Sequence, residues 1–456
     1  MVRRSKDKRA GDVSVVSTVN PISATMSAVA ADDLNRLYAR VSRRLMPPLL
    51  LAYIVAYLDR VNVGFAKLEM LKDLGFSETV YGLGAGIFFI GYFLLGVPSN
   101  LVLHRLGARR WLALLMVSWG VISSCMCSVT SVQGFYALRF LLGVAEAGFF
   151  PGVIFFLTQW YSPARRSRAN ALFMLAVPIC GAAGSIASGA ILQSLDGSHG
   201  WAGWQWLFVL EGAPAVLVGI YLAFTLDDDV RGASWLSAEE RAAIAASLAS
   251  PEPALGSVGA ALRDGRVWLG CLIYFCAVCG IYGVSFWLPS IIVDLGFREP
   301  MRVGILSAIP YAAAGCGMVW VGRSADRRRE HRWHLIGSSL VGAAGLFLSG
   351  LLSAHVVAAF SMLILATFGT LTMAPLFWSL TSRYLEGVGA AAGIGLINSF
   401  GCLAGFVSPY AIGWIRQSTG STKLGLYAVA IVVAVGAMLV ALVPVRRTVA
   451  PAVAGH

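Results

Sequence analysis

Twelve apolar stretches, each about twenty residues long, constrain the fold of this chain more than any other feature. A helix of about twenty apolar residues spans the roughly 30 Å of hydrocarbon in a bilayer. Because backbone polar groups inside lipid must find partners within their own segment, we predict an all-α membrane protein with twelve transmembrane helices. The stretches lie near residues 45–66, 80–103, 111–130, 135–158, 169–192, 205–225, 267–290, 302–321, 334–353, 356–378, 388–412 and 424–444.

The basic residues are sorted between alternate loops. A net charge of +12 would suit nucleic acid or acidic lipid, but most of the 35 Lys and Arg residues fall on one side of the predicted membrane if the N-terminus is cytoplasmic. Positive residues concentrate in cytoplasmic loops, so we interpret the charge as an indicator of topology. We expect both termini in the cytoplasm, membrane lipid around the helices, and no nucleic-acid partner.

One long polar loop divides the twelve stretches into two sets of six. The first 44 residues lack the uninterrupted apolar run and cleavage site of a signal peptide, so we interpret them as a cytosolic tail. In the long loop, Ser237 and Glu240 have the spacing of a capping box, which predicts a short helix at the cytoplasmic surface. The predicted domains are a tail at 1–44, a six-helix bundle at 45–225, a cytosolic linker at 226–266, a second six-helix bundle at 267–445 and a cytosolic tail at 446–456.

The two sets repeat each other at a shift of about 222 residues. The loop "NLVLHRLGARRW" (100–111) aligns with "GRSADRRREHRW" (322–333), and each is short and rich in arginine. Repeats of this kind produce two bundles related by an axis along the membrane normal, with any substrate site between them near the midplane.

Four charged residues fall deep inside predicted spans: Asp59, Arg60, Arg139 and Glu146. Glu211 is a shallower fifth. Each costs about 2.5–3.5 kcal/mol at a helix centre, so a function is expected, although permanent ion pairs that hold the first bundle together are the structural alternative. Arg139 and Glu146 are seven residues apart, two helical turns, and therefore project from one face.

The first span separates its two charges. Tyr53, Tyr57 and Arg60 share one helix face, while Asp59 lies about 100° round and can point to the span at 135–158. A buried arginine stays cationic, and its planar fork fits a carboxylate, which indicates an organic anion as substrate. A buried carboxylate can change protonation because desolvation and a neighbouring arginine act on it in opposite directions, and proton coupling requires such a group.

Several motifs together resemble a known transporter family. The pattern Gxxx(D/E)RxGx(R/K)(R/K), approximated at 100–110 and at 322–332, resembles the signature of the major facilitator superfamily. "YLDRVN", "GYFLLGVPSNLVLHRLGARRW", "RFLLGVAEAGFFPG" and "GWQWLFVLEGAP" are similar to its anion:cation symporter branch, which includes tartrate, phthalate, nicotinate and sugar-acid permeases. The resemblance covers nearly the whole chain beyond the first forty residues.

This resemblance implies proton-coupled import of a small organic anion by rocker-switch alternating access, in the inner membrane of a bacterium and as a monomer. It assigns protons to Asp59 and Glu146, the substrate carboxylate to Arg60 and coupling to Arg139. A cytoplasmic gate motif is implied at the two signature loops, with the residues Arg105, Arg109, Arg110, Asp326 and Arg327.

Other residues are expected to shape the cavity. Tyr92 is predicted to contribute a phenol, with a packing or interfacial tyrosine as the alternative. The resemblance favours Trp378 and Asn398 as substrate contacts, although an intramembrane Asn also serves as interhelical glue. Ser379 is a further candidate. The fifth stretch offers Met174, Val177 and Cys180 rather than amides or hydroxyls, which favours an aromatic acid or a compact carboxylate such as a hydroxy-dicarboxylate over a sugar acid.

The sequence lacks the patterns of other chemistries. No His falls in the core of a span, and no Walker A loop or catalytic constellation is present, so we expect no enzyme, no metal site and no cofactor beyond the coupling proton. Two alternatives stay open. One is an exporter or exchanger of drugs or organic ions, although Arg60 and Arg139 argue against a cationic cargo. The other is a non-transporting membrane receptor.

Overall fold

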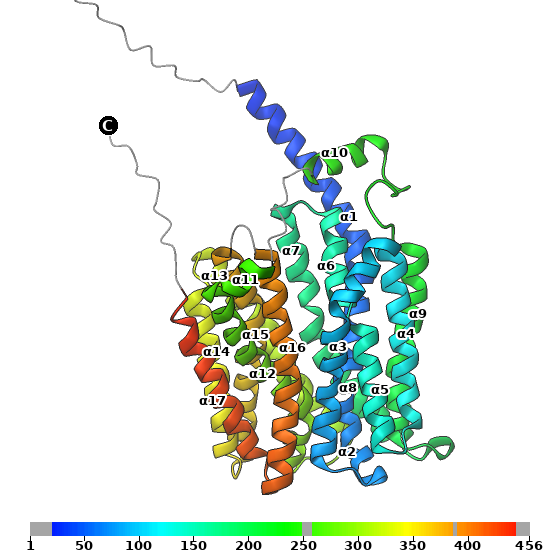
Figure 1. The fold of residues 1–456 in the computed structure, drawn as a ribbon, viewed down its shortest axis with the longest axis vertical. Helices are drawn as coiled ribbons and strands as arrows, with labels where there is room; N and C mark the ends of the chain where they lie inside the picture. The colour runs from blue at the N-terminus through cyan, green and yellow to red at the C-terminus, as the bar shows by residue number, and fades with distance from the viewer. Residues whose placement is uncertain (1–20, 249–257, 386–389, 444–456) are drawn as a thin grey trace, which may run out of the picture.

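The computed structural model describes residues 21–248, 258–385 and 390–443, which form an almost entirely helical molecule (Figure 1). Within these ranges twelve spans are long and apolar enough to cross a membrane, which confirms the predicted fold class. The first half contains α1 (Pro21–Val61), α2 (Val63–Leu74), α3 (Glu78–Leu106), α4 (Ala108–Cys125), α5 (Val132–Glu146), α6 (Phe149–Trp160), α7 (Pro163–Met174), α8 (Ala176–Leu195) and α9 (Gly203–Thr225). The linker carries α10 (Ala238–Leu248) and α11 (Val258–Arg263), and the second half contains α12 (Gly265–Asp294), α13 (Pro300–Arg327), α14 (Arg332–Leu351), α15 (Val356–Tyr384), α16 (Ala390–Thr419) and α17 (Thr422–Val440).

Most helices extend beyond the apolar stretches that predict them. Helix α1 already begins at Pro21, inside the segment interpreted as a tail, and α13 continues to Arg327. Hydropathy detects only the part of a helix that suits hydrocarbon, whereas the backbone remains helical where water or headgroups can satisfy polar side chains. Three spans consist of two consecutive helices, and the first of these breaks falls at Asn62, directly after the charged pair in α1.

Polar caps fix where several helices begin. Ser77 accepts a hydrogen bond from the backbone N–H of Val80 at 3.2 Å at the start of α3, and Ser131 does the same for Gly134 at the start of α5. In the linker the backbone N–H of Glu240 donates to Ser237 Oγ at 3.1 Å, and the N–H of Ser237 donates to Glu240 Oε2 at 3.0 Å. These reciprocal bonds confirm the predicted capping box of α10.

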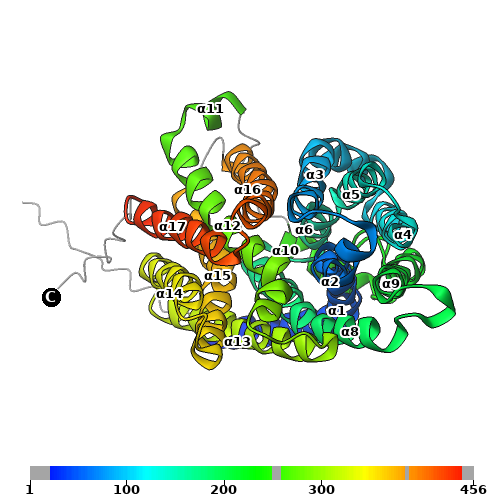
Figure 2. The same cartoon turned by 90° about the horizontal axis from the view of Figure 1, so that it is seen from below.

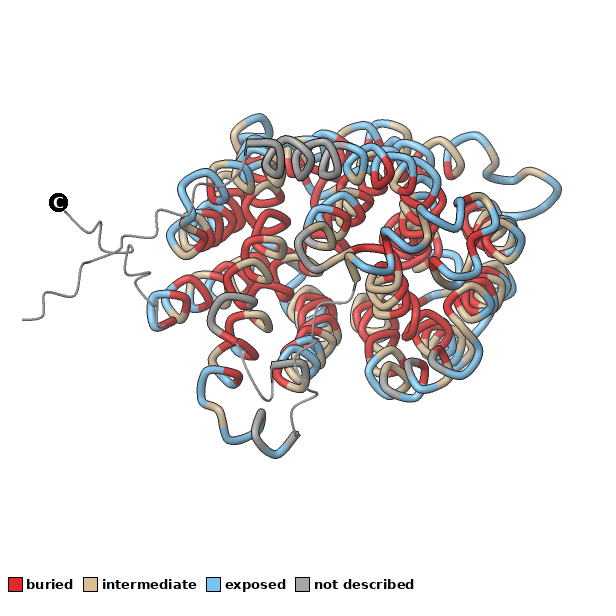
Figure 3. Tube along the Cα trace, turned by 90° about the horizontal axis from the view of Figure 1, so that it is seen from above, coloured by how far each residue is buried: buried red, intermediate tan, exposed pale blue. Residues whose placement is uncertain are grey.

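The helices form two groups that lie side by side (Figure 2). We call the end that carries the start of α1 and helix α10 the terminal end, and the end where α2 lies the closed end (Figure 1). Seen from the terminal end, buried segments concentrate where helices face one another, and exposed segments lie mostly at the periphery (Figure 3). The two groups meet chiefly through α3 against α16 and α8 against α13.

Glycines allow these two contacts to be very close. A β-carbon at Gly304 on α13 would stand 2.4 Å from the carbonyl oxygen of Ser185 on α8, and one at Gly189 would stand 2.5 Å from that of Pro300. Between α3 and α16, a β-carbon at Gly82 would stand 2.7 Å from the carbonyl oxygen of Pro409. Small residues permit such close helix approach in membranes. All of these positions lie in the closed-end parts of their helices.

Charged groups also join the halves at the closed end. Glu78 on α3 accepts from Lys67 Nζ at 2.7 Å and from Arg416 Nε of α16 at 3.0 Å. Arg416 Nη1 contacts Asp294 Oδ2 of α12 at 3.0 Å. The Lys67 ammonium is itself buried and lies 3.7 Å from the ring centroid of Trp287 on α12. We call Lys67, Glu78, Asp294 and Arg416 the closed-end ion network.

Candidate functional site

A cavity lies between the two halves, with about 890 Å³ of empty space when its opening to solvent is included. Eight residues singled out from the sequence line it together: Tyr53, Tyr57, Arg60, Tyr92, Met174, Val177, Trp378 and Asn398. Because the contacts between the halves described above lie at the closed end, the cavity stands on the terminal-end side of that seal.

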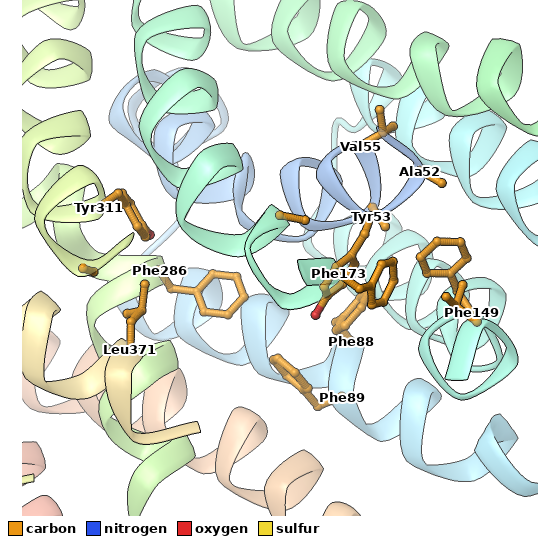
Figure 4. Close-up of a cluster of buried hydrophobic side chains, with 14 of the residues drawn as sticks. Ala52, Tyr53, Val55, Phe88, Phe89, Phe149, Phe173, Phe286, Tyr311 and Leu371 are labelled. Atoms are coloured by element: carbon orange, nitrogen blue, oxygen red, sulfur yellow. The ribbon is translucent and has the colours of Figure 1, made fainter. Parts of the chain in front are cut away.

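Aromatic rings form much of its wall. Tyr53 stacks on Phe173 of α7 with ring centroids 4.4 Å apart, a pair that Figure 4 shows at the centre of a buried aromatic cluster. From the second half, the ring of Tyr274 lies 4.8 Å from that of Phe377 and 4.9 Å from that of Trp378. Such walls bind apolar or aromatic parts of a ligand and leave orientation to a few polar groups.

Arg60 provides the positive charge of this cavity. Its Nη2 donates to Glu146 Oε2 at 2.7 Å, and its Nε contacts the same oxygen at 3.3 Å. Nη1 donates to the hydroxyl of Tyr282 on α12 at 3.2 Å, which links the guanidinium to the second half. The guanidinium also lies 5.2 Å from the ring centroid of Tyr92. Arg60 therefore holds a carboxylate in place within the protein while one side of its fork faces a phenol of the cavity wall.

Asp59 lies on the other side of α1 and does not line the cavity. It is fully buried, and Ser123 Oγ of α4 donates to its Oδ1 at 2.7 Å. Within the described residues its Oδ2 has no hydrogen-bond partner. Asp59 is hydrogen-bonded to the third span, and it also interacts electrostatically with Glu146 and Arg139 of the span at 135–158, toward which the sequence predicts that it can point. The 100° step between adjacent residues separates Asp59 from Arg60 as expected.

Arg139 is buried in the first half beside these groups. Its Nε donates to the carbonyl oxygen of Gly84 on α3 at 3.2 Å, and its guanidinium lies 5.2 Å from the ring centroid of Phe88. In the described part of the chain, neither Nη atom has a hydrogen-bond partner. Arg139 and Arg60 both act electrostatically on Glu146. One carboxylate is thus shared between two arginines, of which one reaches the cavity.

The remaining predicted site residues lie elsewhere. Ser379 is half-buried on α15, next to Trp378, and is not among the residues that line the cavity. In the signature loops, Arg105 and Arg110 are exposed, the backbone N–H of Arg109 donates to Asp228 Oδ1 at 2.7 Å, and Arg327 is exposed. Asp326 lies 3.0 Å from His331 Nε2. The side chains of Asn100 and His104, which replace glycine and acid in the first loop, lie outside the described residues.

Other lining residues carry no signal in the sequence. Phe89, Phe150, Met318, Leu371 and Cys402 are ordinary membrane-helix residues, and only the packing of the two halves brings them to the cavity. Tyr282 of α12 also lines the cavity, and its hydroxyl accepts a hydrogen bond from Arg60. Among the lining residues that the structure describes, those of the second half include no Asp, Glu, Lys or Arg.

Comparisons with known proteins agree with this arrangement. Residues 49–409 match the model of the Major Facilitator Superfamily. The chain is 45% identical over 409 residues to a putative tartrate transporter of Agrobacterium vitis, covering 89% of this chain and 94% of that protein. It is 42% identical to the putative metabolite transport protein NicT of Pseudomonas putida, covering 90% of this chain and 95% of NicT. It is also 42% identical to a quinolone resistance transporter of Acinetobacter baumannii, covering 88% and 93%.

Solved structures share the fold at low identity. A bacterial homologue of the human lysosomal transporter Spinster, in an inward-facing and unoccupied conformation, superposes with a TM-score of 0.72 at 18% identity, covering 87% of this chain and 96% of that chain. The xylose transporter XylE of E. coli, in a partially occluded inward-open conformation, gives a TM-score of 0.69 at 16% identity, covering 87% and 96%.

Proposed function

The chain belongs to the major facilitator superfamily of membrane transporters, and from that premise we propose that it carries a small organic anion across the membrane together with protons. The observation that carries this proposal is Arg60, a cation on the wall of the central cavity whose partner in the empty protein is the carboxylate of Glu146. An arginine fork can bind a substrate carboxylate through two parallel hydrogen bonds. To Glu146, Arg60 directs both of its N–H groups at the single oxygen Oε2.

Proton coupling follows from competition for Arg60. While Glu146 is ionised, it occupies the guanidinium and opposes a second negative charge. When Glu146 takes a proton, its hold on Arg60 weakens and the fork turns to the substrate carboxylate. Arg139 lies close enough to act on Glu146 and stabilises its ionised form once the substrate has left. Asp59, buried on the other face of α1, is proposed as the second proton site.

The proposed setting is the inner membrane of a bacterium with both termini cytoplasmic. In that orientation the terminal end is cytoplasmic and the closed end external, so this structure is inward-facing. A rocker-switch cycle would part α8 from α13 and α3 from α16 at the closed end and bring the halves together at the terminal end. The glycine contacts and the closed-end ion network support such a seal, since both sit at helix faces shared by the halves.

The cavity favours carboxylates with an apolar or aromatic body. Its wall offers stacked rings and few amides, and Asn398 and the phenols are the polar groups available to orient a second substituent. A tartrate transporter at 45% identity supports a hydroxy-dicarboxylate as the alternative within the same class. Tartrate and nicotinate are therefore suitable first probes, one for each chemistry.

Uptake into proteoliposomes tests the proposal. An external pH below the internal pH should drive accumulation of radiolabelled tartrate or nicotinate, and Asp59→Asn should abolish the gradient-driven component because an amide cannot carry a proton. Exchange of labelled for unlabelled substrate at equal pH should persist in that variant. If Asp59→Asn kept the full pH dependence of the unchanged protein, Asp59 would not be a proton site.

Export of a drug is the second candidate. Its specific support is the quinolone resistance transporter, which is 42% identical to this chain. Direction separates the two functions: an importer accumulates the anion on the side where protons arrive, whereas a proton-driven exporter moves cargo against the proton flow. A pH dye entrapped in the proteoliposomes follows the internal pH during transport of each probe. It shows directly whether protons move in the same direction as the cargo or in the opposite direction.

A further inference from the structure

A second, smaller cavity between the halves has room for about one water molecule. It is lined on the first half by Asn62 and Ser188 and on the second by Ser285, Ser307 and Tyr311. Along α8, α12 and α13 these residues follow those of the central cavity in the direction of the closed end. The smaller cavity therefore stands between the central cavity and the seal. Its wall is mainly apolar, and the Asn, Ser and Tyr side chains in it supply hydrogen-bond partners for a single water.

Glu211 of α9 reaches this cavity through Ser188. The carboxylate is buried, with 2% of the residue exposed, and Ser188 Oγ donates to its Oε1 at 2.6 Å. Its Oε2 has no hydrogen-bond partner among the described residues. The amide of Asn62 lies beside Glu211, and within the same residues neither of its polar atoms makes a hydrogen bond of ordinary geometry. Ser307 Oγ, on the opposite wall of the cavity, is likewise buried without a partner there. Buried polar atoms of this kind are normally satisfied, so water is the natural occupant.

Asn62 also connects Glu211 with Asp59. Asp59 is in the last turn of α1 and Asn62 is at the break between α1 and α2, three residues later and still in αR conformation, so both project to one side. Asp59 Oδ2 and Glu211 Oε2 are both unpaired in the described chain, the charges of the two carboxylates interact, and the thiol of Cys180 lies near both.

The groups that face Glu211 from neighbouring helices are uncharged or acidic. They are Ser188 and Cys180 on α8, Asp59 on α1, and Asn62 at the break between α1 and α2. Helix α4 presents Gly120 and Ser124 one residue further along α9, at Gly212. Glu69 on α2 faces the start of α9 at Gly203, two turns earlier. No arginine or lysine is among these groups, so Glu211 is not held ionised by an ion pair as Glu146 is.

We infer that Glu211 is the relay group that passes protons between the closed-end side of the membrane and Asp59, a role that rests on the proposed symport function. Water in the smaller cavity gives one proton to Glu211. Glu211 then releases that proton through water beside Asn62 to Asp59 Oδ2 and is left ionised, ready for the next. Ser188 is a positioning residue, since its hydroxyl holds Oε1 and leaves Oε2 to exchange protons.

The seal gives this route a direction. The contact of Gly304 with Ser185 closes the smaller cavity toward the closed end, and Gly181 packs against the Tyr311 ring on its other flank. Parting α8 from α13 opens the cavity to that side of the membrane, so Glu211 meets bulk protons only in the state opposite to the one described here. Asp59 is then loaded from one side while Glu146 and Arg60 serve the other.

Glu211→Gln in proteoliposomes tests the relay. Uptake of labelled tartrate or nicotinate is measured as the external pH is varied at fixed internal pH, alongside exchange at equal pH. In the variant, gradient-driven uptake should fall by about tenfold or more because a proton-transfer group has been removed. Most of the dependence of uptake on external pH should be lost as well. Exchange and substrate-induced thermal stabilisation should remain, and Glu211→Asp should restore part of the pH dependence.

Two further variants keep the test decisive. Glu69→Gln removes a neighbouring acid outside the route and should leave the pH profile unchanged. If Glu211→Gln does not purify as a folded protein, Ser188→Ala replaces it and should shift the external-pH dependence without lowering exchange. A wild-type pH profile in a folded Glu211→Gln variant, or in Ser188→Ala where that variant stands in, overturns the relay. Absence of pH-driven uptake of both probes by the unchanged protein overturns the symport proposal instead.

Discussion

At the scale of single residues, adjacent charges in α1 have separate surroundings. Arg60 faces the central cavity and pairs with Glu146, while Asp59 is buried against α4, where the Ser123 hydroxyl donates to it and the Trp119 indole lies beside it. A helix turns about 100° per residue, so the two side chains leave α1 in different directions. The pair is therefore not a local neutralisation of two charges, and each residue can be changed without removing the direct contacts of the other.

Replacing Arg60 with Gln should weaken anion binding at every pH. A charge-assisted hydrogen bond contributes about 1.5–3 kcal/mol, so affinity for tartrate or nicotinate should fall roughly 10- to 100-fold. Isothermal titration of the purified protein measures this. Arg60→Lys is the matched variant, since it keeps the charge and loses the planar fork. Its affinity for the anion should lie between those of the unchanged protein and Arg60→Gln. Equal affinity in all three proteins would remove Arg60 from the substrate site.

The sequence predicts much of the site at this scale. The i, i+4, i+7 spacing correctly groups Tyr53, Tyr57 and Arg60 on one face, and all three line the cavity. The spacing cannot identify every neighbouring helix, and the hydrogen bond from Ser123 of the third span to Asp59 has no signal in the sequence. Residues such as Phe89 and Met318 are chemically ordinary, and their role depends on how the two halves pack rather than on local pattern.

At the scale of helices, glycine decides how closely α8 and α13 approach. The pair Gly189 and Gly304 lets the two backbones touch at the seal, whereas Gly143 allows a similar approach of α5 to α3 inside the first half, where a β-carbon would stand 1.9 Å from the carbonyl oxygen of Phe88. The same structural device thus serves a contact that must open and one that stays closed.

Gly304→Ala should therefore favour opening of the closed end. The added methyl group meets the Ser185 backbone only when the halves are together, and overpacking of this kind costs about 1–3 kcal/mol. Hydrogen–deuterium exchange should rise in the closed-end parts of α8 and α13. Gly143→Ala is the control: it should lower the thermal midpoint without raising exchange selectively at the seal. If Gly304→Ala left hydrogen–deuterium exchange at the closed end unchanged, the contact of Gly304 with Ser185 would not limit opening.

Helix existence was predictable and helix extent was not. Each of the twelve apolar stretches corresponds to a span, because hydrocarbon imposes length and composition together. The extension of α1 back to Pro21 and the break at Asn62 carry no hydropathy signal, since one lies in a polar segment and the other interrupts the helix by a single residue.

At the scale of the whole molecule, the closed-end ion network joins α2, α3, α12 and α16. Glu78 binds one cation from each half, and Arg416 binds one carboxylate from each half. The network can persist only while the halves are together, so it stabilises the state described here relative to the state open at the closed end.

Arg416→Gln should shift that balance. Losing its charged hydrogen bonds, at about 1.5–3 kcal/mol, changes the ratio of the two states by roughly tenfold or more. The distance between the halves at the closed end can be measured with spin labels at Lys72→Cys and Lys423→Cys, in a background lacking the exposed Cys125 and Cys316. In Arg416→Gln, a larger share of molecules should show a longer distance between the two labels. Arg302→Gln, which removes an exposed pair with Glu299 inside α13, should leave the distances unchanged.

The unequal distribution of charge between the halves has a consequence for how such a protein changes its cargo. Asp59, Arg60, Arg139, Glu146 and Glu211 all belong to the first half, while the second half lines the described cavity without acids or strong bases. In the proposed symport, the proton groups therefore belong to one half of the chain, while the other half contributes an uncharged part of the cavity wall. On that proposal, substitutions on α12, α15 and α16 should change the substrate range without removing a proton group, which makes the second half the natural target for redesigning specificity.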